Sequence, residues 1–237
     1  MTFLKVSNLE KRFEKKEVLK DLDLFIEETE VFSLLGPNAS GKTTLLKVIS
    51  NIYRPTSGKI EVVGAEVQMN PNSVRERVGF VGHETYLYPE LTARENLKFY
   101  TMAYGVRNQE EKIKEKLKLV GMYPRMNDTV KEFSRGMKQR VSIARALIHE
   151  PKLLLLDEPF TGLDFEARKV FVNIIEDFTD ESGPVLMSSH DPEIAWRVSQ
   201  RVGILEKGRI KYILSTQKNE YSNLEDAINS IKWKVQS

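Results

Sequence analysis

Short runs of hydrophobic residues alternate along the chain with longer stretches in which hydrophobic residues recur every three or four positions. Four runs have the length of strands: 30–36, 151–159, 184–190 and 201–208. Continuous apolar runs of this kind are typical of strands buried on both faces of a parallel sheet. Helical patterns follow several of them, over 42–52, 164–180 and 191–199. The pattern therefore predicts an α/β fold, in which Leu45, Leu46, Ile49 and Ile52 share the buried side of the first helix.

The middle of the chain differs, because residues 92–149 show only helical periodicity. Its apolar positions fall in three groups: 97–104, then Ile113, Leu117 and Val120, then the run after Ser134. The charged tract 109–118 is interpreted as the solvated face of a helix. Glu110 and Lys114 lie four residues apart on that face, which favours a helix over a binding site.

These patterns predict one domain, 1–237, with three parts. An α/β core (1–90 and 150–216) receives a helical subdomain (91–149). A tail, 217–237, has apolar residues at helical spacing and is expected to pack on the core or on a partner: Leu224, Ile228 and Ile231. The length of 237 residues is sufficient for one sizeable core.

Composition narrows the class of protein. Thirty-six basic and 34 acidic residues give a net charge of +2 without a basic stripe, so nucleic acid is not an expected partner. The chain has no cysteine, which excludes disulfides and thiolate metal sites. No run approaches the roughly 18 apolar residues of a membrane span, and the N-terminus lacks the apolar core of a signal peptide. We therefore expect a soluble, cytoplasmic protein.

The most specific motif is GPNASGKT, Gly36 to Thr43, which fits G-x-x-x-x-G-K-[ST] between a buried strand and an amphipathic helix. A triphosphate needs several unobstructed backbone N–H donors and a helix N-terminus, and glycines at this junction supply both. Lys42 would then reach the β- and γ-phosphates, and the Thr43 hydroxyl would bind Mg²⁺. An ordinary glycine-rich turn is a much weaker interpretation.

Two acids end a second buried run. Leu153 to Leu156 lead into Asp157 and Glu158 at the carboxyl edge of the predicted sheet, where ligands of open α/β sheets bind. Asp157 would hold Mg²⁺ directly or through water, and Glu158 would act as a general base on the attacking water. The alternative is an acid capping the helix near 164, which fits one acid better than both.

The stretch FSRGMKQRVSIARAL, 133–147, begins a helix, with Ser134 in the position of an N-cap. A cap alone does not explain Gly136, because glycine is costly in a first helical turn and allows close approach to a phosphate. Either a helix start or a second phosphate-binding tip fits these residues. His149 is expected to end this helix as a favourable C-terminal cation without chemistry of its own.

Taken together, the motifs resemble the ATP-binding subunit of the ATP-binding cassette (ABC) transporter family across essentially the whole chain. FSRGMKQR resembles the family signature, TGLD (161–164) the D-loop, and SSHD (188–191) the switch histidine. Phe13 stands where the family has an aromatic that stacks on adenine, and 80–97 stands where it has the Q-loop. The resemblance implies a P-loop NTPase core with a mixed, largely parallel sheet, an N-terminal antiparallel β region and an inserted helical subdomain.

The resemblance also implies roles for the matching residues. Those expected to act in catalysis are Glu158, His190, Lys42 and His83. Those expected to bind ATP are Phe13, Gly36, Pro37, Asn38, Ala39, Ser40, Gly41, Lys42, Thr43 and Thr44. The tip formed by Ser134, Arg135, Gly136 and Met137 would cover the ATP of a second subunit. Asp164 would belong to the D-loop. Mg²⁺ would be held by Thr43, by Asp157 and, less securely, by His83.

Several residues depart from the family pattern. Ala39 replaces a glycine, and if its φ is positive the loop is strained and nucleotide affinity falls. Arg135 and Met137 replace a glycine and a glutamine of the signature, while Ser134 and Gly136 are kept. His83 replaces the Q-loop glutamine, and its imidazole can still donate or accept a hydrogen bond.

The expected partners are a second ATP-binding subunit, identical or different, and integral membrane permease subunits. The permeases would dock in a groove near 83–90 and place the chain on the cytoplasmic face of the cell membrane. Gly82-His83 and the sequence LTARENL are reminiscent of heme-exporter ATPases. The alternatives are a soluble mechanical ATPase of a protein assembly, such as iron-sulfur cluster assembly, and a regulator that does not hydrolyse ATP.

Overall fold

The main sheet has six strands, and its strand ends lead into the phosphate-binding motif and the two acids. The structure is a computed structural model and describes residues 2–69, 71–216, 224, 226 and 227. The strand order is β10-β9-β3-β8-β7-β6. The bounds are β3 Val31–Leu35, β6 Val78–Val81, β7 Leu153–Asp157, β8 Val185–Ser189, β9 Arg201–Glu206 and β10 Arg209–Ser215. All neighbours pair in parallel except β9 and β10, so the sheet is mixed and largely parallel.

A second sheet is antiparallel and comes mainly from the N-terminal part of the chain. Its order is β2-β1-β4-β5. Its strands are β1 Thr2–Phe13, β2 Lys16–Glu27, β4 Ser57–Val62 and β5 Ala65–Glu66. Helix α1 (Lys42–Ile49) lies between the two sheets, and its leucines share a buried cluster with residues of both. Packing against both sheets therefore fixes the position of the helix that follows the phosphate-binding motif.

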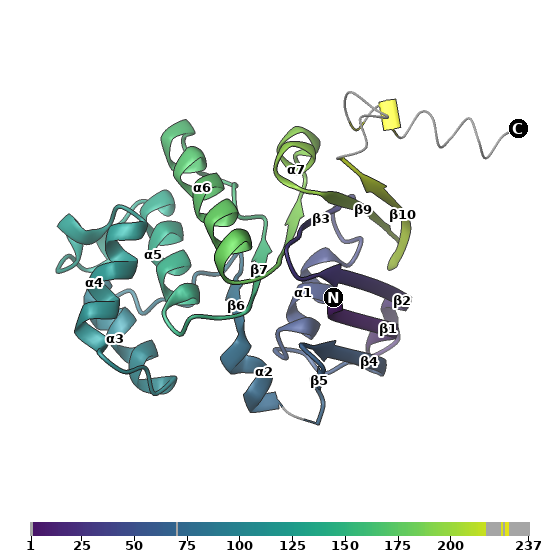
Figure 1. The fold of residues 1–237 in the computed structure, drawn as a ribbon, viewed down its shortest axis with the longest axis horizontal. Helices are drawn as coiled ribbons and strands as arrows, with labels where there is room; N and C mark the ends of the chain where they lie inside the picture. Colours follow the sequence, from purple (N-terminus) through teal and green to yellow (C-terminus); the bar gives the residue numbers. More distant parts are fainter. Residues whose placement is uncertain (1, 70, 217–223, 225, 228–237) are drawn as a thin grey trace, which may run out of the picture.

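The remaining helices fall into two groups, as Figure 1 shows. Helices α6 and α7 belong to the core, and α2 leads into β6; their bounds are α2 Pro71–Arg77, α6 Phe165–Glu181 and α7 Pro192–Val198. The others form a helical subdomain at one side: α3 Ala93–Ala103, α4 Gln109–Leu119, η1 Tyr123–Arg125, η2 Val130–Glu132 and α5 Arg135–Leu147. One hydrophobic cluster joins this group to α6 and the parallel sheet. The helical subdomain and the sheet therefore share a core.

Helix α4 has the two sides that its sequence predicts. Ile113 and Leu117 are completely buried. On the charged side, Glu110 forms an ion pair with Arg94 of α3 at 2.8 Å. The solvated face therefore also ties two helices of the subdomain together.

The predicted α/β fold and the antiparallel N-terminal region are confirmed, and all four predicted strands are present. The first helix, however, ends at Ile49 and not at 52. Asn51 takes a left-handed φ of 58°, which turns the chain out of the helix. The prediction that Ile52 is buried with Leu45 is therefore wrong, and Ile52 is 45% exposed.

The tail is described only in part. Leu224 is buried in a small cluster with Leu35 and Leu214, so this residue packs on the core as one of the two alternatives predicted. Ile228 and Ile231 lie outside the described residues. Within the described part of the chain, no helix has the length and apolar character needed to cross a membrane.

Candidate functional site

The loop between β3 and α1 closes tightly over the end of the sheet. Gly41 has φ 115°, and a Cβ there would lie 2.9 Å from Leu19 Cδ2 and 3.2 Å from the Val18 carbonyl oxygen. A side chain at this position would therefore collide with β2. Ala39 takes φ 62°, a left-handed conformation that favours glycine. The positive φ that would strain the loop at this position is therefore present.

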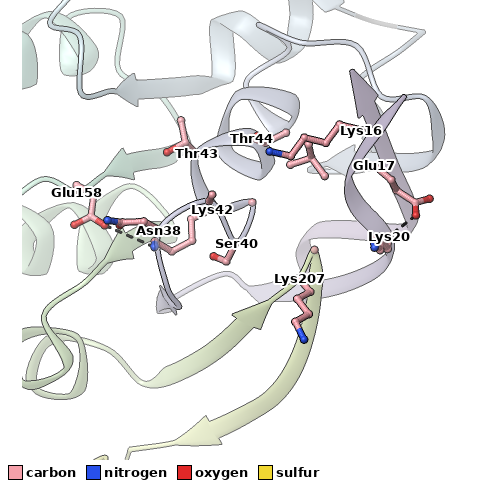
Figure 2. A pocket seen from close by; sticks show the side chains of 14 residues that line it. Lys16, Glu17, Lys20, Asn38, Ser40, Lys42, Thr43, Thr44, Glu158 and Lys207 are labelled. Atoms are coloured by element: carbon pink, nitrogen blue, oxygen red, sulfur yellow. Dashed lines mark ion pairs between the residues drawn. The ribbon is translucent and has the colours of Figure 1, made fainter. Parts of the chain in front are cut away.

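A cavity of about 470 Å³ opens over this loop. Figure 2 shows lysines around it, contributed by the loop, by β2 and by the turn between β9 and β10. They are Lys16, Lys20, Lys42 and Lys207. Of the predicted ATP-binding residues, the loop positions 38–44 all line the cavity. Its volume and its positive rim suit a nucleoside triphosphate.

Lys42 is held in place from both sides. Its ammonium donates to the carbonyl oxygens of Gly36 at 2.7 Å and Pro37 at 3.3 Å, and its side chain is only 7% exposed. Glu158 Oε1 lies 3.9 Å from its Nζ (Figure 2). The structure thus brings the loop lysine and the predicted general base together.

Asp157 and Thr43 meet as the sequence predicted. The Thr43 hydroxyl donates to Asp157 Oδ1 at 3.0 Å. The same oxygen accepts from the Ser188 hydroxyl at 2.7 Å, and the Glu158 N–H donates to that hydroxyl at 2.9 Å. The serine therefore fixes the two acids relative to each other. The motif SSHD alone assigns Ser188 no role, although its position two residues before His190 at a strand end is a usable signal.

Glu158 and His190 face each other across the ends of β7 and β8. His190 Nδ1 lies 2.5 Å from Glu158 Oε2, and the His190 N–H donates to the same oxygen at 3.2 Å. Glu158 has φ 55°, which is unfavourable for a residue with a side chain. Contacts from Ser188 and His190 at the end of β8, and from Lys42, hold Glu158 in place.

His83 lies on the other side of the two acids. It lines a separate cavity of about 280 Å³ together with Arg135, Asp157, Glu158 and Thr161. The cavity brings the Q-loop position, the signature and the acidic strand end of one chain together. Arg135 also lies over Gly162, because a Cβ on that glycine would be 3.1 Å from Arg135 Cδ.

The signature tip, residues 134–137, begins α5. It does not line the 470 Å³ cavity over the phosphate-binding loop of its own chain. Ser134 is the N-cap, and its hydroxyl accepts from the Met137 N–H at 3.3 Å. A Cβ at Gly136 would meet nothing closer than the Gly162 carbonyl oxygen at 3.7 Å. Packing within the chain therefore gives no reason for a glycine there.

Phe13 and Asp164 lie outside the large cavity. Phe13 ends β1, is 39% exposed, and packs edge-on against Tyr53 with ring centroids 5.3 Å apart. The Lys11 ammonium lies 4.6 Å from the centroid of the Phe13 ring. Asp164 caps α6, because its carboxylate accepts from the Ala167 N–H at 2.7 Å. The acid that caps this helix is thus neither Asp157 nor Glu158.

A third cavity, of about 380 Å³, lies between the core and the helical subdomain; we call it the tyrosine groove. Its lining includes Ile52, Arg75, Tyr86, Tyr100, Tyr104, Arg145 and His149. The sequence analysis predicted a groove near 83–90, and Tyr86 belongs to that segment. His83 lines the cavity beside the acids instead, so the segment divides between two cavities.

The prediction that His149 is a cation at the end of helix α5 is wrong. Helix α5 ends at Leu147. The imidazole of His149 stacks on Tyr104 with ring centroids 4.0 Å apart, and its Nε2 lies 3.3 Å from the Val78 carbonyl oxygen. Burial lowers its pKa to about 4, so the ring is neutral at pH 7.

Four features define the class of this protein: the phosphate-binding loop, Lys42, the two acids at the end of β7, and the helix α5 that begins at the signature. They are those of a P-loop ATPase of the ATP-binding cassette class. Residues 19–161 match the sequence profile of the family described as ABC transporter. The chain belongs to this family. It is an ATP-binding and ATP-hydrolysing subunit of an ABC transporter, and the predicted family and activity are confirmed.

Named relatives agree with this assignment. The chain is 39% identical over 214 residues to the ABC transporter ATP-binding protein NatA of Bacillus subtilis (strain 168), with 87% of each protein covered. It is 36% identical over 227 residues to the lantibiotic transport ATP-binding protein SrtF of Streptococcus pyogenes, with 96% of each covered.

Solved structures show the same fold. An ATP-binding subunit of an ABC transporter has a TM-score of 0.85 at 29% identity, covering 97% of this chain and 93% of that one. A dimeric ATP-binding cassette in a post-hydrolysis state, bound to ADP and Pi, has a TM-score of 0.83 at 26% identity, covering 90% and 99%.

Proposed function

We propose that two ATP-binding subunits close around two ATP molecules and that this closure moves membrane permease chains docked in the tyrosine groove. The observation that carries the proposal is the position of one loop. His83 lines the cavity beside Asp157 and Glu158, and Tyr86, three residues further along, lines the tyrosine groove. A change at the nucleotide therefore reaches the groove through a few residues of backbone.

ATP binding rests on the loop and the lysines around the large cavity. The backbone N–H groups of 38–44, which include the N-terminus of α1, would bind the phosphates, with Lys42 at the β- and γ-phosphates. Phe13 would stack on the adenine ring with its exposed side, since base stacking on an aromatic contributes about 1–3 kcal/mol. The lysine rim accounts for attraction of a polyanion from solution.

Mg²⁺ fits the pair formed by Thr43 and Asp157. A hydroxyl and a carboxylate oxygen 3.0 Å apart are hard ligands of the kind that Mg²⁺ takes, together with phosphate oxygens and water. When bound, Mg²⁺ supplies neutralisation of the charge that develops on the phosphates. Ser188 keeps the Asp157 carboxylate oriented for this role, and His83, which lines one cavity with both acids, would contribute a contact through water.

Hydrolysis would use Glu158 as general base on the attacking water. His190, bonded to the same carboxylate, would hold it in line with the γ-phosphate. Lys42 neutralises the phosphate charge and contacts Glu158, so the base and the electrophile are set by one network. The strained φ of Glu158 indicates that the fold fixes this geometry before ATP arrives.

The second subunit completes the site. Ser134 and Gly136 open α5 with a positive helix end and no side-chain obstruction, and Arg135 and Met137 flank them. This tip would cover the γ-phosphate of the partner's ATP, while Asp164 and its loop would meet the equivalent loop. Because the γ-phosphate contacts both subunits only in the closed pair, ATP favours closure and hydrolysis releases it.

The tyrosine groove is the proposed docking site of the permease chains, which would place this subunit peripherally on the cytoplasmic face of the membrane. The relatives named above are transport proteins, which favours this role over the alternative of a cluster-assembly ATPase. The division into a core of 1–90 and 150–216 and a helical subdomain of 91–149 then has a function. The groove runs along the boundary between the two parts.

Substitution of Glu158 tests the proposal. Glu158→Gln should lower ATP turnover about 10²- to 10⁴-fold, because a general base is lost while the charges that bind ATP remain. Mixed with Mg²⁺ and ATP, the variant should sediment as a dimer, and from native membranes it should retain permease chains. Glu176→Gln, an exposed acid on α6, is the matched control and should behave as the wild type. Unchanged turnover in the Glu158 variant, or a monomer at saturating ATP, would contradict the proposal.

A further inference from the structure

Arg145 is a buried cation in the wall of the tyrosine groove. Its side chain comes from α5, and the residue is only 9% exposed. A buried charge is unfavourable unless it is paired and fully hydrogen-bonded. The partners of this guanidinium therefore show whether the chain alone satisfies it.

The chain satisfies Arg145 only partly. One terminal nitrogen donates to the Phe80 carbonyl oxygen at 2.6 Å, while the buried Nε has no hydrogen-bond partner among the residues that the structure describes. The rings of Tyr86 and Tyr100 lie 5.6 and 5.2 Å from the Cζ atom and give cation–π contacts. Within the described residues, no carboxylate forms an ion pair with Arg145, and burial lowers its pKa.

The charge of the whole groove has the same sign. Arg75 is its second charged lining residue, and none of the described residues that line it is an acid. Ile52 and Tyr104 are exposed beside these cations, so apolar surface and positive charge lie next to each other. A ligand that matches this wall carries an apolar group and a negative group a few ångströms apart.

We propose that the tyrosine groove accepts a segment of the membrane partner that presents a carboxylate to Arg145 and an apolar side chain to Ile52 and Tyr104. This inference rests on the proposed function, because it specifies the chemistry of the permease segment that docks there. A carboxylate is favoured over a lone carbonyl because the planar guanidinium offers parallel N–H donors that match two carboxylate oxygens.

A small probe tests the chemistry of the groove without the permease. The purified full chain, labelled with ¹⁵N, is titrated with 3-phenylpropionate and separately with its neutral amide, 3-phenylpropionamide. The Arg145 Nε–H signal should shift saturably with the carboxylate, with an affinity at least about tenfold above that of the amide. Equal affinities, or no saturable shift with the carboxylate, would overturn the inference.

A matched pair of substitutions avoids removing Arg145, whose hydrogen bond to Phe80 supports β6. Ile52 is exposed, so Ile52→Glu and Ile52→Gln should both fold, as thermal unfolding would verify. The glutamate would supply the missing negative charge within the chain and abolish binding of the probe. The glutamine variant loses the same apolar contact without adding a charge, so it should bind the probe more weakly than the wild type but at least about tenfold more tightly than the glutamate variant. Loss of binding in both variants to the same extent would contradict a role for charge.

The same pair separates this inference from the proposed function. Each is combined with Glu158→Gln and purified with ATP from native membranes. Ile52→Glu should retain at least about tenfold less permease than Ile52→Gln. If both retain equal amounts, the carboxylate inference fails while the proposed docking stands. If neither these variants nor the parent Glu158→Gln protein retains a membrane protein, the proposed function fails and the inference with it.

Discussion

Ser188 is the residue through which the two acids of the site are joined. It is completely buried, donates to Asp157 and accepts from the backbone N–H of Glu158. Replacing it leaves a buried carboxylate oxygen with one donor fewer and a buried N–H without an acceptor. Both the orientation of the acids and the stability of the strand ends depend on this hydroxyl.

Ser188→Ala should therefore destabilise the fold by about 1–3 kcal/mol and lower ATP turnover roughly tenfold or more. Ser33→Ala is a suitable control, because Ser33 is equally buried and its hydroxyl bonds to Ser199 away from the nucleotide. Steady-state turnover and chemical denaturation of both variants check this. A similar loss of stability with a similar loss of turnover in both would argue against a specific role for Ser188.

His149 makes stability depend on pH. Burial sets its folded pKa at about 4, below the ordinary value of 6.5, so the unfolded chain takes up this proton first as the pH falls. The contribution of the neutral His149 ring to the free energy of unfolding is fully present above pH 6.5, and it is lost as the pH falls from about 6.5 to 4. It amounts to about 2–3 kcal/mol in the free energy of unfolding.

His149→Phe keeps an aromatic ring against Tyr104 and removes the titration. Urea unfolding of the variant and the wild type at several pH values gives the difference between them. That difference should change by about 2–3 kcal/mol between pH 6.5 and 4 and stay constant above pH 7. Parallel curves across the whole range would show that His149 titrates alike in both states.

In helix α5, the proposed function favours glycine at position 136, whereas the stability of the helix favours a residue with a side chain. Glycine weakens a helix, and the surroundings within the chain leave room for a methyl group. Gly136→Ala should raise the free energy of unfolding by about 0.5–1 kcal/mol. The same methyl group would stand between the helix end and the partner's γ-phosphate.

ATP turnover of Gly136→Ala should accordingly fall about 10- to 100-fold, because small displacements at a phosphate are costly. Calorimetry and steady-state kinetics on one preparation measure both effects. A variant that is less stable as well as less active would indicate that the glycine serves the fold of its own chain.

Periodicity predicted the elements that have long, uniform patterns, such as α6, and those bounded by motifs, such as β3 and β7. It did not single out β6, whose four residues have no pattern long enough to recognise. The strand is defined by its pairing with β7, in which Val78 lies opposite Leu153. Contacts between segments far apart in sequence decided this element, and local pattern carries no signal for them.

The same division holds for the site. Motif spacing predicted the phosphate loop and the acids, and the structure brings Lys42, Thr43, Asp157, Glu158 and His190 together. Ser188 and Arg145 were not assigned roles, because their partners are 31 and 65 residues away in the chain. Whether a buried polar side chain is satisfied is a property of the packed molecule.

In the proposed dimer, each ATP site is built from two chains. Two chains with different defects can therefore restore one working site between them. Glu158→Gln disables hydrolysis but has an intact signature tip, whereas Gly136→Ala has an intact base and a blocked tip. In a mixed dimer, one of the two sites combines the intact halves. Two-fold symmetry of the parent dimer makes this outcome independent of which chain carries which defect.

Equal amounts of the two variants should therefore recover about a quarter of the wild-type activity, since half of the dimers are mixed and each has one working site. Each variant measured alone at the same total concentration is the control. Activity equal to the sum of the separate values would show that each chain hydrolyses ATP without its mate.

The short separation of His83 and Tyr86, with two residues between them, has a pharmacological consequence. Energetic coupling between two binding sites acts equally in both directions. If ATP binding shifts the proposed loop, a small compound held beside Tyr86 that resists the shift would weaken ATP binding, and ATP would weaken binding of the compound by the same factor. An inhibitor of that type would act at a distance from the nucleotide cavity and would lose potency as the ATP concentration rises.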